Sequence, residues 1–385
     1  MYPVEDLIET TRKLAKGTRP SIVVAKAPGR VEVMGNHTDY NGGLVLAATI
    51  ERYVWSVGVR SDDTVVCSRE FDECMTLEDG PVPPSQELNW KTYIRGVHWS
   101  LDRRGHTLRG LAASVGGDVP LGAGLSSSAA LEVSYTNLLN VLGGLRLNSI
   151  DLATVAYEAE RHYCNVSCGI MDQFTSQLCK RNSVLGIDCS TRITWDSELD
   201  PGLRLVVVDS MIRRSAADVL NQRRHECTVA LETLRQAGYE IENLSQLTPR
   251  QIPEIERLLD DTAFKRVRHV VEENERVRTA TDLLMDYDFW GFGNLMFQSH
   301  ESSRDLYEVS HENLDLLVEM SRSIEGVLGA RMTGAGLGGS ILALVKYDHV
   351  ESFVSSIVSL YERETGLTPS VIHGAIPGGP EVRWL

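Results

Sequence analysis

The sequence lacks the features that mark membrane, secreted and nucleic-acid-binding proteins. No apolar run reaches the roughly 20 residues that cross a bilayer, and the N-terminal stretch has neither the basic start nor the apolar core of a signal peptide. The seven cysteines are an odd number without framework spacing, so we expect reduced thiols and a cytoplasmic protein. The formal net charge of −15 disfavours nucleic acid and anionic membranes as partners.

The length and the distribution of apolar residues indicate two globular lobes. A chain of 385 residues, 42% of them hydrophobic, can bury a large core in about two domains. It shows neither an internal repeat nor a linker long enough to separate its halves. Near residue 190 the pattern changes from glycine-rich loops and helices to alternating strands and long helices. We therefore expect one lobe over residues 1–190 and a second over residues 191–385.

Apolar periodicity predicts an α+β mixture of elements. The expected strands cover residues 21–25, 31–34, 44–60, 64–68, 108–115, 183–188, 203–209 and 341–345. The expected helices cover residues 4–16, 90–101, 131–140, 151–163 and 254–285, with a further long helix that ends near residue 234. The apolar stripe of the 254–285 helix is typical of ordinary core packing.

The stretch 116–132 has the composition of an anion site. Gly122 and Gly124 let the backbone approach a ligand closely, and the three serines 126–128 can cap the helix that follows. The first turn of that helix presents unpaired N–H groups and a positive dipole end, which favour phosphate. The lysine of a Walker A loop is absent, and Ser127 replaces the third glycine of the dinucleotide fingerprint. A helix start with an elaborate cap is the alternative interpretation.

A second loop, residues 36–41, is dense in hydrogen-bonding side chains. Asn36, His37 and Asp39 follow a short strand and precede two glycines. Polar loops on a rigid scaffold are typical ligand sites, and Asp with His can bind neighbouring hydroxyls of a small polar molecule. A hydrogen-bonded turn without a ligand explains the same residues about equally well.

Three further segments are open to two interpretations. Asp172 lies among apolar neighbours, where an acid is either a helix cap or a working group. The arginine pairs 213–214 and 223–224 could face a phosphate, but a solvated helix face is the favoured interpretation. Residues 334–339 satisfy G-x-G-x-x-G, yet a strand follows them rather than a helix, so they favour backbone lying against a ligand over a dinucleotide site.

Taken together, these blocks resemble the GHMP small-molecule kinases, and within them the galactokinases. The three blocks 28–43, 117–129 and 331–340 occur in the order of that superfamily, and Gly35-Asn36-His37-Thr38-Asp39-Tyr40-Asn41 resembles the galactokinase signature. Residues 168–173 and 307–310 extend the similarity over essentially the whole chain. The resemblance implies an α+β fold of two lobes, ribosomal-S5-domain-2-like and ferredoxin-like, with the active site in their cleft. As partners we expect the sugar and ATP, and we expect a monomer or homodimer.

The resemblance also implies the reaction and the residues that carry it. Such kinases transfer the γ-phosphoryl group of ATP to the anomeric hydroxyl of a sugar. Asp172 would accept or orient the hydroxyl proton, and Arg30 would contact both Asp172 and the moving phosphoryl group. The ATP-binding set would be Trp90 at adenine and Gly122, Ala123, Gly124, Leu125, Ser126, Ser127 and Ser128 at the phosphates. Ser128 and Glu160 would hold Mg²⁺, while the sugar contacts would be Asn36, His37, Asp39, Gly169 and Leu220. The loop 334–339 would brace the sugar and the phosphate loop.

Two departures from the galactokinase pattern affect the expected sugar. Asn36 stands where the family usually has the Glu that binds near the sugar 6-hydroxyl, and Leu220 stands where it usually has Tyr. Losing the negative charge would let the site tolerate a 6-carboxylate, so galacturonate, glucuronate and N-acetylgalactosamine are alternatives to galactose, which we rank first. A non-catalytic sugar and ATP sensor is the alternative of another class. It would require a damaged phosphate loop or a missing acid, and neither is seen.

Overall fold

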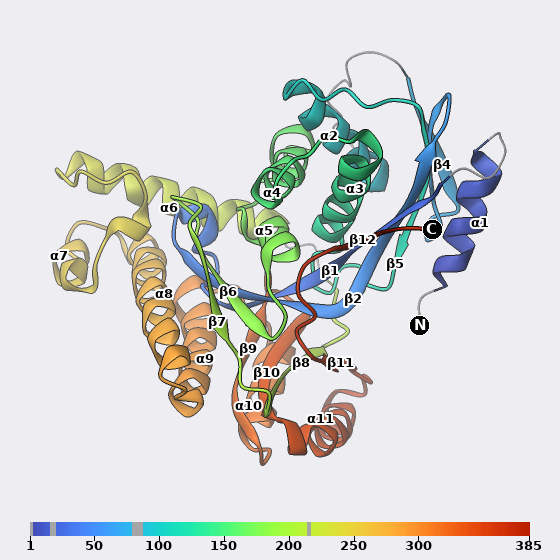
Figure 1. Cartoon of the computed structure of the whole chain (residues 1–385). Coiled ribbons are helices and arrows are strands. Elements are labelled where there is room, and N and C mark those ends of the chain that lie inside the picture. The colour runs from blue at the N-terminus through green and yellow to red at the C-terminus, as the bar shows by residue number, and fades with distance from the viewer. Residues whose placement is uncertain (1–2, 16–20, 79–87, 214–216) are drawn as a thin grey trace.

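Two β-sheets organise the computed structural model, which describes residues 3–15, 21–78, 88–213 and 217–385 (Figure 1). The larger sheet has the strand order β12-β1-β2-β5-β3-β4, with β6 pairing to β2 and β7 pairing to β6. The smaller sheet has the order β11-β8-β10-β9. None of the helices that the structure describes combines the length and the apolar character needed to cross a bilayer.

The larger sheet contains the strands of the first half of the chain and two others. Its strands are β1 (Val23–Met34), β2 (Leu44–Arg60), β3 (Thr64–Ser68), β4 (Glu73–Leu77), β5 (Leu111–Gly117), β6 (Ser183–Asp188), β7 (Thr194–Glu198) and β12 (Glu381–Trp384). The two strands expected at 21–25 and 31–34 form one strand. Register shifts after Pro28 and Glu32 bend β1 against β2, so the strand continues through the proline.

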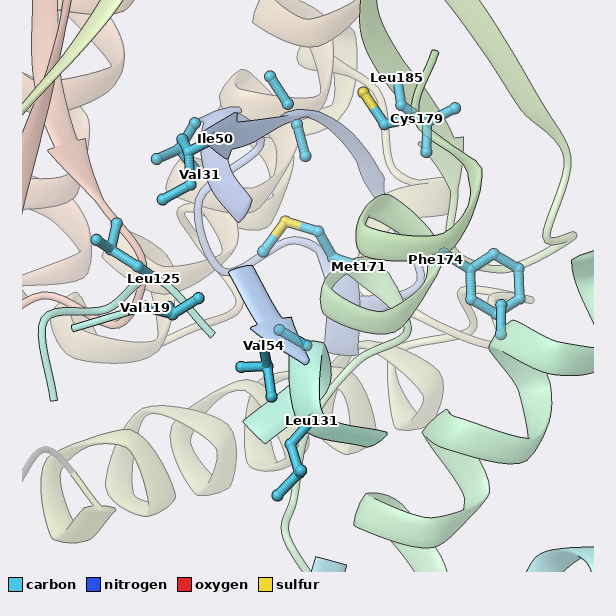
Figure 2. Packing of buried hydrophobic residues seen from close by; sticks show 14 of the residues in the cluster. Val31, Ile50, Val54, Val119, Leu125, Leu131, Met171, Phe174, Cys179 and Leu185 are labelled. Carbon is cyan, nitrogen blue, oxygen red and sulfur yellow. The ribbon is translucent and has the colours of Figure 1, made fainter. Parts of the chain in front are cut away.

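Four helices cover one face of this sheet and carry most of the candidate site. They are α2 (Trp90–Arg103), α3 (Ser127–Gly143), α4 (Ser149–Glu158) and α5 (Met171–Leu178), seen in green and teal in Figure 1. Helix α1 (Val4–Leu14) packs elsewhere on the sheet, against β2 and β5. Figure 2 shows how side chains from β1, β2 and α5, among them Val31, Ile50 and Met171, meet in the buried core. This packing places the first turn of α5 directly on β1.

The smaller sheet and six helices form the rest of the molecule. The strands are β8 (Leu203–Asp209), β9 (Val327–Thr333), β10 (Ser340–Lys346) and β11 (Ser370–Gly374). The helices are α6 (Ala217–Gln236), α7 (Ile252–Ile255), α8 (Asp261–Met285), α9 (Phe289–Ser302), α10 (Glu312–Arg322) and α11 (Val350–Thr365). The single helix expected over 254–285 is therefore divided, since the Asp260 side chain caps a new helix by accepting from Ala263 N.

The two sheets do not divide the chain at one point. β7 and β12 follow residue 190, yet both belong to the larger sheet, and β12 pairs with β1 near the start of the chain. The lobe boundary at residues 190 and 191 therefore stays a prediction.

One sequence expectation about cysteine is wrong. Cys67 of β3 and Cys74 of β4 face each other in the antiparallel register and form a disulfide. Their separation of seven residues matches no framework pattern, so only the pairing of the strands reveals it. Cys164, Cys168, Cys179, Cys189 and Cys227 are free thiols. Because disulfides are rare in the cytosol, a cytoplasmic location stays a prediction.

Candidate active site

A carboxylate, a guanidinium and a serine hydroxyl meet where β1, α5 and the glycine loop converge. Arg30 donates from Nε to Asp172 Oδ1 at 2.8 Å and from Nη2 to Oδ2 at 2.6 Å, a bidentate pair. Its third nitrogen, Nη1, donates to Gly124 O at 2.7 Å. The Ser126 hydroxyl also donates to Asp172 Oδ2. Asp172 lies in the first turn of α5, where the helix dipole favours a negative charge. The structure thus brings together the predicted acid and its arginine.

The glycine loop before α3 adopts a conformation that its composition requires. Gly122 and Gly124 have φ of 69° and 77°, in the left-handed region that glycine enters without strain. Ser126 also has positive φ, and its hydroxyl makes no capping hydrogen bond to the helix. The expectation that this serine caps α3 is therefore wrong, and its hydroxyl is directed at Asp172 instead. The first amides of α3 consequently have no cap from that serine side chain.

The second glycine-rich loop packs directly on the first. Ser340 donates from its hydroxyl to Ala123 O at 2.9 Å. A Cβ placed on Gly334 would lie 2.9 Å from Gly124 O, so only glycine permits this approach. This arrangement supports the predicted role of residues 334–339 as a brace for the phosphate loop.

Buried carboxylates lie next to Asp172 on the helical side. The Ser128 hydroxyl donates to Glu160 Oε1 at 3.1 Å, and Gln173 Nε2 donates to both Glu160 and Glu132. Glu160 lies in a π-helical turn (Ala159–Tyr163) that follows α4. Burial, together with the nearby negative charge of Asp172, raises the pKa of Glu160 to about 7. The Ser128 and Glu160 oxygens are hard donors of the kind that Mg²⁺ prefers.

A pocket of about 310 Å³ adjoins the glycine loop on the side of α2. It is lined by residues that include Phe71, Trp90, Tyr93 and Leu131. Trp90 is the first residue of α2, and the Asn89 side chain fixes that helix start by accepting from two backbone amides. The pocket has an aromatic wall and opens beside Ser127 and Ser128, which fits the predicted adenine site.

The polar loop after β1 is held by stacked aromatic rings. The His37 ring stacks on Tyr307, with centroids 4.9 Å apart, and its Nδ1 lies 2.9 Å from Tyr40 OH. Burial and the neighbouring His269 lower the pKa of His37 to about 3, so its ring is neutral. The Asp39 carboxylate lies against Gly169, where any Cβ would collide with it. The predicted sugar contacts His37, Asp39 and Gly169 therefore share one loop cluster.

The sequence predicted that Asn36 removes the carboxylate from this end of the loop. The structure instead places the carboxylate of Glu32 against the Asn36 side chain. Its Nδ2 donates to Glu32 Oε1 at 3.0 Å and to Gly334 O at 3.1 Å. Its Oδ1 accepts from the Ser303 hydroxyl at 2.9 Å. Glu32 in turn forms an ion pair with Arg331 at 2.9 Å, and both side chains are buried. A negative charge is therefore present at this end of the loop, supplied by Glu32.

Two residues of α8 also hold the polar loop after β1. From the sequence, this helix was expected to serve core packing alone. Glu273 Oε1 accepts from the backbone amides of Gly35 and Asn36 at 2.9 and 3.2 Å. His269 Nε2 lies 2.9 Å from Asn36 O. Both side chains are completely buried, as are Arg266 and Asn274 on the same helix. Polar and ionisable residues interrupting the apolar stripe were the signal that could have identified them.

The favoured interpretation of the second arginine pair is wrong. Arg223 is buried and donates to the backbone carbonyls of Tyr307 and Glu308. Arg224 lies over the Tyr40 ring at 4.6 Å, beside the polar loop, rather than on a solvated face. Arg213 does reach solvent and pairs with Asp209, while Arg214 is outside the described residues. Leu220 lies half-buried one turn before Arg223, and its contact with a sugar stays a prediction.

Comparison with known protein families agrees with this geometry. Residues 92–180 match the family profile described as GHMP kinases N terminal domain, and residues 282–363 match GHMP kinases C terminal. The fold and these two matches thus define a GHMP small-molecule kinase. Residues 13–59, which hold Arg30 and the polar loop, match the galactokinase galactose-binding signature.

Individual relatives narrow the assignment. The chain is 38% identical to a galactokinase of Clostridium acetobutylicum, with 89% of this chain and 90% of the relative covered. It is 37% identical to a galactokinase of Thermotoga maritima, covering 89% and 95%. The structure of Lactococcus lactis galactokinase complexed with galactose superposes with a TM-score of 0.91 at 30% identity, covering 97% and 99%. The chain belongs to the galactokinase family, and it is a sugar kinase.

The similarity to more distant kinases concerns the fold alone. Mevalonate kinase of Methanococcus jannaschii superposes with a TM-score of 0.62 at 15% identity, covering 96% of this chain. The two-lobed fold expected from the sequence is confirmed.

Proposed function

We propose that this protein transfers the γ-phosphoryl group of ATP to the anomeric hydroxyl of galactose, giving galactose 1-phosphate. The observation that carries the proposal is the Arg30–Asp172–Ser126 contact at the mouth of the glycine loop. It joins an acid, a phosphate-binding loop and a guanidinium within hydrogen-bonding distance. Galactokinase relatives and the galactose-binding signature support galactose as the sugar.

In this mechanism the side chains position the reactants and balance their charge. Phosphoryl transfer passes through a loose transition state, so alignment and electrostatic stabilisation supply most of the catalysis. Asp172 orients the anomeric hydroxyl and takes its proton on a carboxylate oxygen, while the anomeric oxygen forms its bond to the γ-phosphorus and ADP leaves. Arg30 lies between that carboxylate and the phosphate loop, where it can stabilise the charge on the moving group.

We further propose that Ser128 and Glu160 hold Mg²⁺ together with the ATP phosphates. Among the described residues no group of three or more His, Cys, Asp or Glu side chains could hold a metal ion unaided. One carboxylate and one hydroxyl beside a phosphate loop match the way Mg²⁺ is usually bound, with phosphate and water oxygens completing the shell. The ion would neutralise phosphate charge when bound.

A sugar panel tests the proposal. ADP release is measured with galactose, galacturonate, glucuronate and N-acetylgalactosamine, and phosphorus NMR identifies the phosphorylated position. We expect the largest kcat/KM with galactose and a 1-phosphate product. Faster turnover of another sugar would overturn the choice of galactose. Sugar binding without any sugar-dependent ADP release would instead indicate a sensor.

A further inference from the structure

A carboxylate on β1 that the predicted site did not include lies on the same face as Arg30. Arg30, Val31 and Glu32 pair in unbroken register with residues 49, 48 and 47 of β2. Side chains two residues apart on a strand point to the same face, so Glu32 shares the face of Arg30. The two Cα atoms are about 7 Å apart at ordinary strand rise.

Charges around Glu32 place it in the sugar half of the site. The pKa of Glu32 is raised, because burial outweighs the opposing charge of Arg331; the charge of Asp39 raises it further and that of Arg30 lowers it. Both Asp39 and Arg30 belong to the predicted sugar and phosphoryl contacts. Glu32 is therefore close to the groups that would surround the sugar.

Asn36 serves Glu32 and is not free to bind a sugar. Both hydrogens of its amide are used, by Glu32 and Gly334, and its oxygen accepts from Ser303. The side chain is fully buried. Its role in the structure is to orient the Glu32 carboxylate.

Arg331 completes the arrangement and retains unused donors. It is fully buried, and its Nη2 forms the 2.9 Å ion pair with Glu32. Its Nε and Nη1 have no hydrogen-bond partner among the residues described. Buried donors normally find acceptors, and a polyhydroxylated ligand can supply oxygen atoms.

We propose that Glu32, oriented by Asn36 and balanced by Arg331, is the specificity-determining group at the end of the sugar site remote from Asp172. Its carboxylate accepts a hydrogen bond from the hydroxyl on C6. The site therefore selects a hexose with a 6-hydroxyl over one with a 6-carboxylate, which the Glu32 charge repels, or with a bare 6-methyl group. This inference rests on the proposed function.

The test compares galactose, 6-deoxygalactose and galacturonate in the wild-type enzyme and in Glu32→Gln. A site built to bind a hydroxyl discriminates strongly against an analogue without it. We expect Glu32→Gln to lower kcat/KM for galactose about 10- to 100-fold while leaving that for 6-deoxygalactose within about threefold, and to raise galacturonate relative to galactose. The KM for ATP should not change.

A merely structural role gives a different pattern. It would lower kcat/KM for all three sugars by the same factor, and that outcome would overturn the inference. If the wild-type enzyme shows no galactose turnover at all, the proposed function fails first. A change in the selectivity ratio and the presence of galactose turnover are thus separate readouts.

Glu32→Gln leaves Arg331 without its ion-pair partner and could destabilise the protein. Two further variants keep a carboxylate in the cluster and test the inference in that case. Glu32→Asp keeps the carboxylate that pairs with Arg331, so the variant should fold. Its side chain is one methylene group shorter, so it should lose part of the preference for galactose over 6-deoxygalactose. Glu32→Asn combined with Asn36→Glu returns a carboxylate to the same cluster and should recover preference for galactose over 6-deoxygalactose. If folded Glu32→Asp keeps the wild-type ratio, or if the folded double variant loses it, the carboxylate does not select the sugar.

Discussion

The candidate site has a nucleotide half, around the glycine loop, and a sugar half, around the polar loop, and the two are built in different ways. The proposed phosphate-binding part consists of neighbouring residues, since the loop 122–128 leads directly into α3. The sugar half consists of buried side chains from distant segments, with Glu32 and Asn36 meeting Glu273, Ser303 and Arg331. A phosphate can be bound by local backbone geometry, whereas distinguishing one hydroxyl pattern from another requires side chains placed by the whole fold.

The largest expected effect lies where the two halves meet. Asp172→Asn keeps the shape of the side chain but removes the proton acceptor, so kcat should fall about 10²- to 10⁴-fold while the KM for ATP stays near wild type. Steady-state ADP release measures both quantities. Asp196→Asn, which removes an acid paired to exposed Lys180, is the matched control and should leave kcat unchanged. Near-normal kcat in Asp172→Asn would remove the acid from the mechanism.

The second-largest effect should distinguish the sugar half of the site from the nucleotide half. Glu273→Gln weakens the support of the polar loop at the amides of Gly35 and Asn36. We expect the KM for galactose to rise about tenfold and the KM for ATP to stay constant. Glu275→Gln on the same helix removes an exposed ion pair with Arg278 and should change neither value. Equal losses for both substrates would mean that the two halves are not independent.

On the nucleotide side we expect a dependence on Mg²⁺ and on pH. Ser128→Ala and Glu160→Gln should each raise the Mg²⁺ concentration for half-maximal rate about tenfold. Because the pKa of Glu160 is raised to about 7, the wild-type carboxylate is protonated below that pH and ionised above it. The Mg²⁺ requirement should therefore decrease as pH rises through 7, and Glu160→Gln should abolish this trend. Glu158→Gln, in a surface pair with Arg104, is the control.

The smallest effect concerns stability. His98 is buried between α2 and α3 with Nε2 2.9 Å from Tyr135 OH, and burial lowers its pKa to about 3. The unfolded state takes up a proton near pH 6.5, whereas the folded state does not, so stability is lost as pH falls from 6.5 towards 3. One such group contributes at most about 1.4 kcal/mol per pH unit.

Denaturant unfolding between pH 7 and 4 measures that slope. His98→Gln should reduce the pH dependence of the free energy of unfolding by about one proton, with little effect on activity at pH 7. The exposed His225→Gln should leave the slope as in the wild-type protein. An unchanged slope in His98→Gln would contradict the neutral state of the buried ring.

Local signals were sufficient for much of the fold. The strands β2, β3, β6 and β8 begin and end at the predicted residues, because their apolar alternation is strong and turn residues bound them. The glycine loop was interpreted as a phosphate site from its glycines and serines at a helix start, and that role stays a prediction. By contrast, the role of Ser126 depends on Asp172, which is 46 residues away in the chain, so its composition alone suggested a cap.

The sugar half was predicted less completely. The polar loop identified His37 and Asp39, but the departure at Asn36 was interpreted as a loss of charge. The compensating carboxylate is that of Glu32 on β1, and its position depends on how β1 pairs with β2. Glu273, which contacts the loop at Gly35, is 238 residues away in the sequence. Nothing in local composition indicates such pairings, so only the folded chain reveals them.

The long separation between these partners has a consequence for biosynthesis. Gly35 and Asn36 leave the ribosome early, but Glu273 follows 238 residues after the former and Ser303 follows 267 residues after the latter. Since β9 with Arg331 comes later still, the hexose site cannot assemble on a nascent chain that stops short of it. Sugar therefore has nothing to bind until translation is almost complete, and the glycine loop likewise lacks its contacts with Gly334 and Ser340 until then.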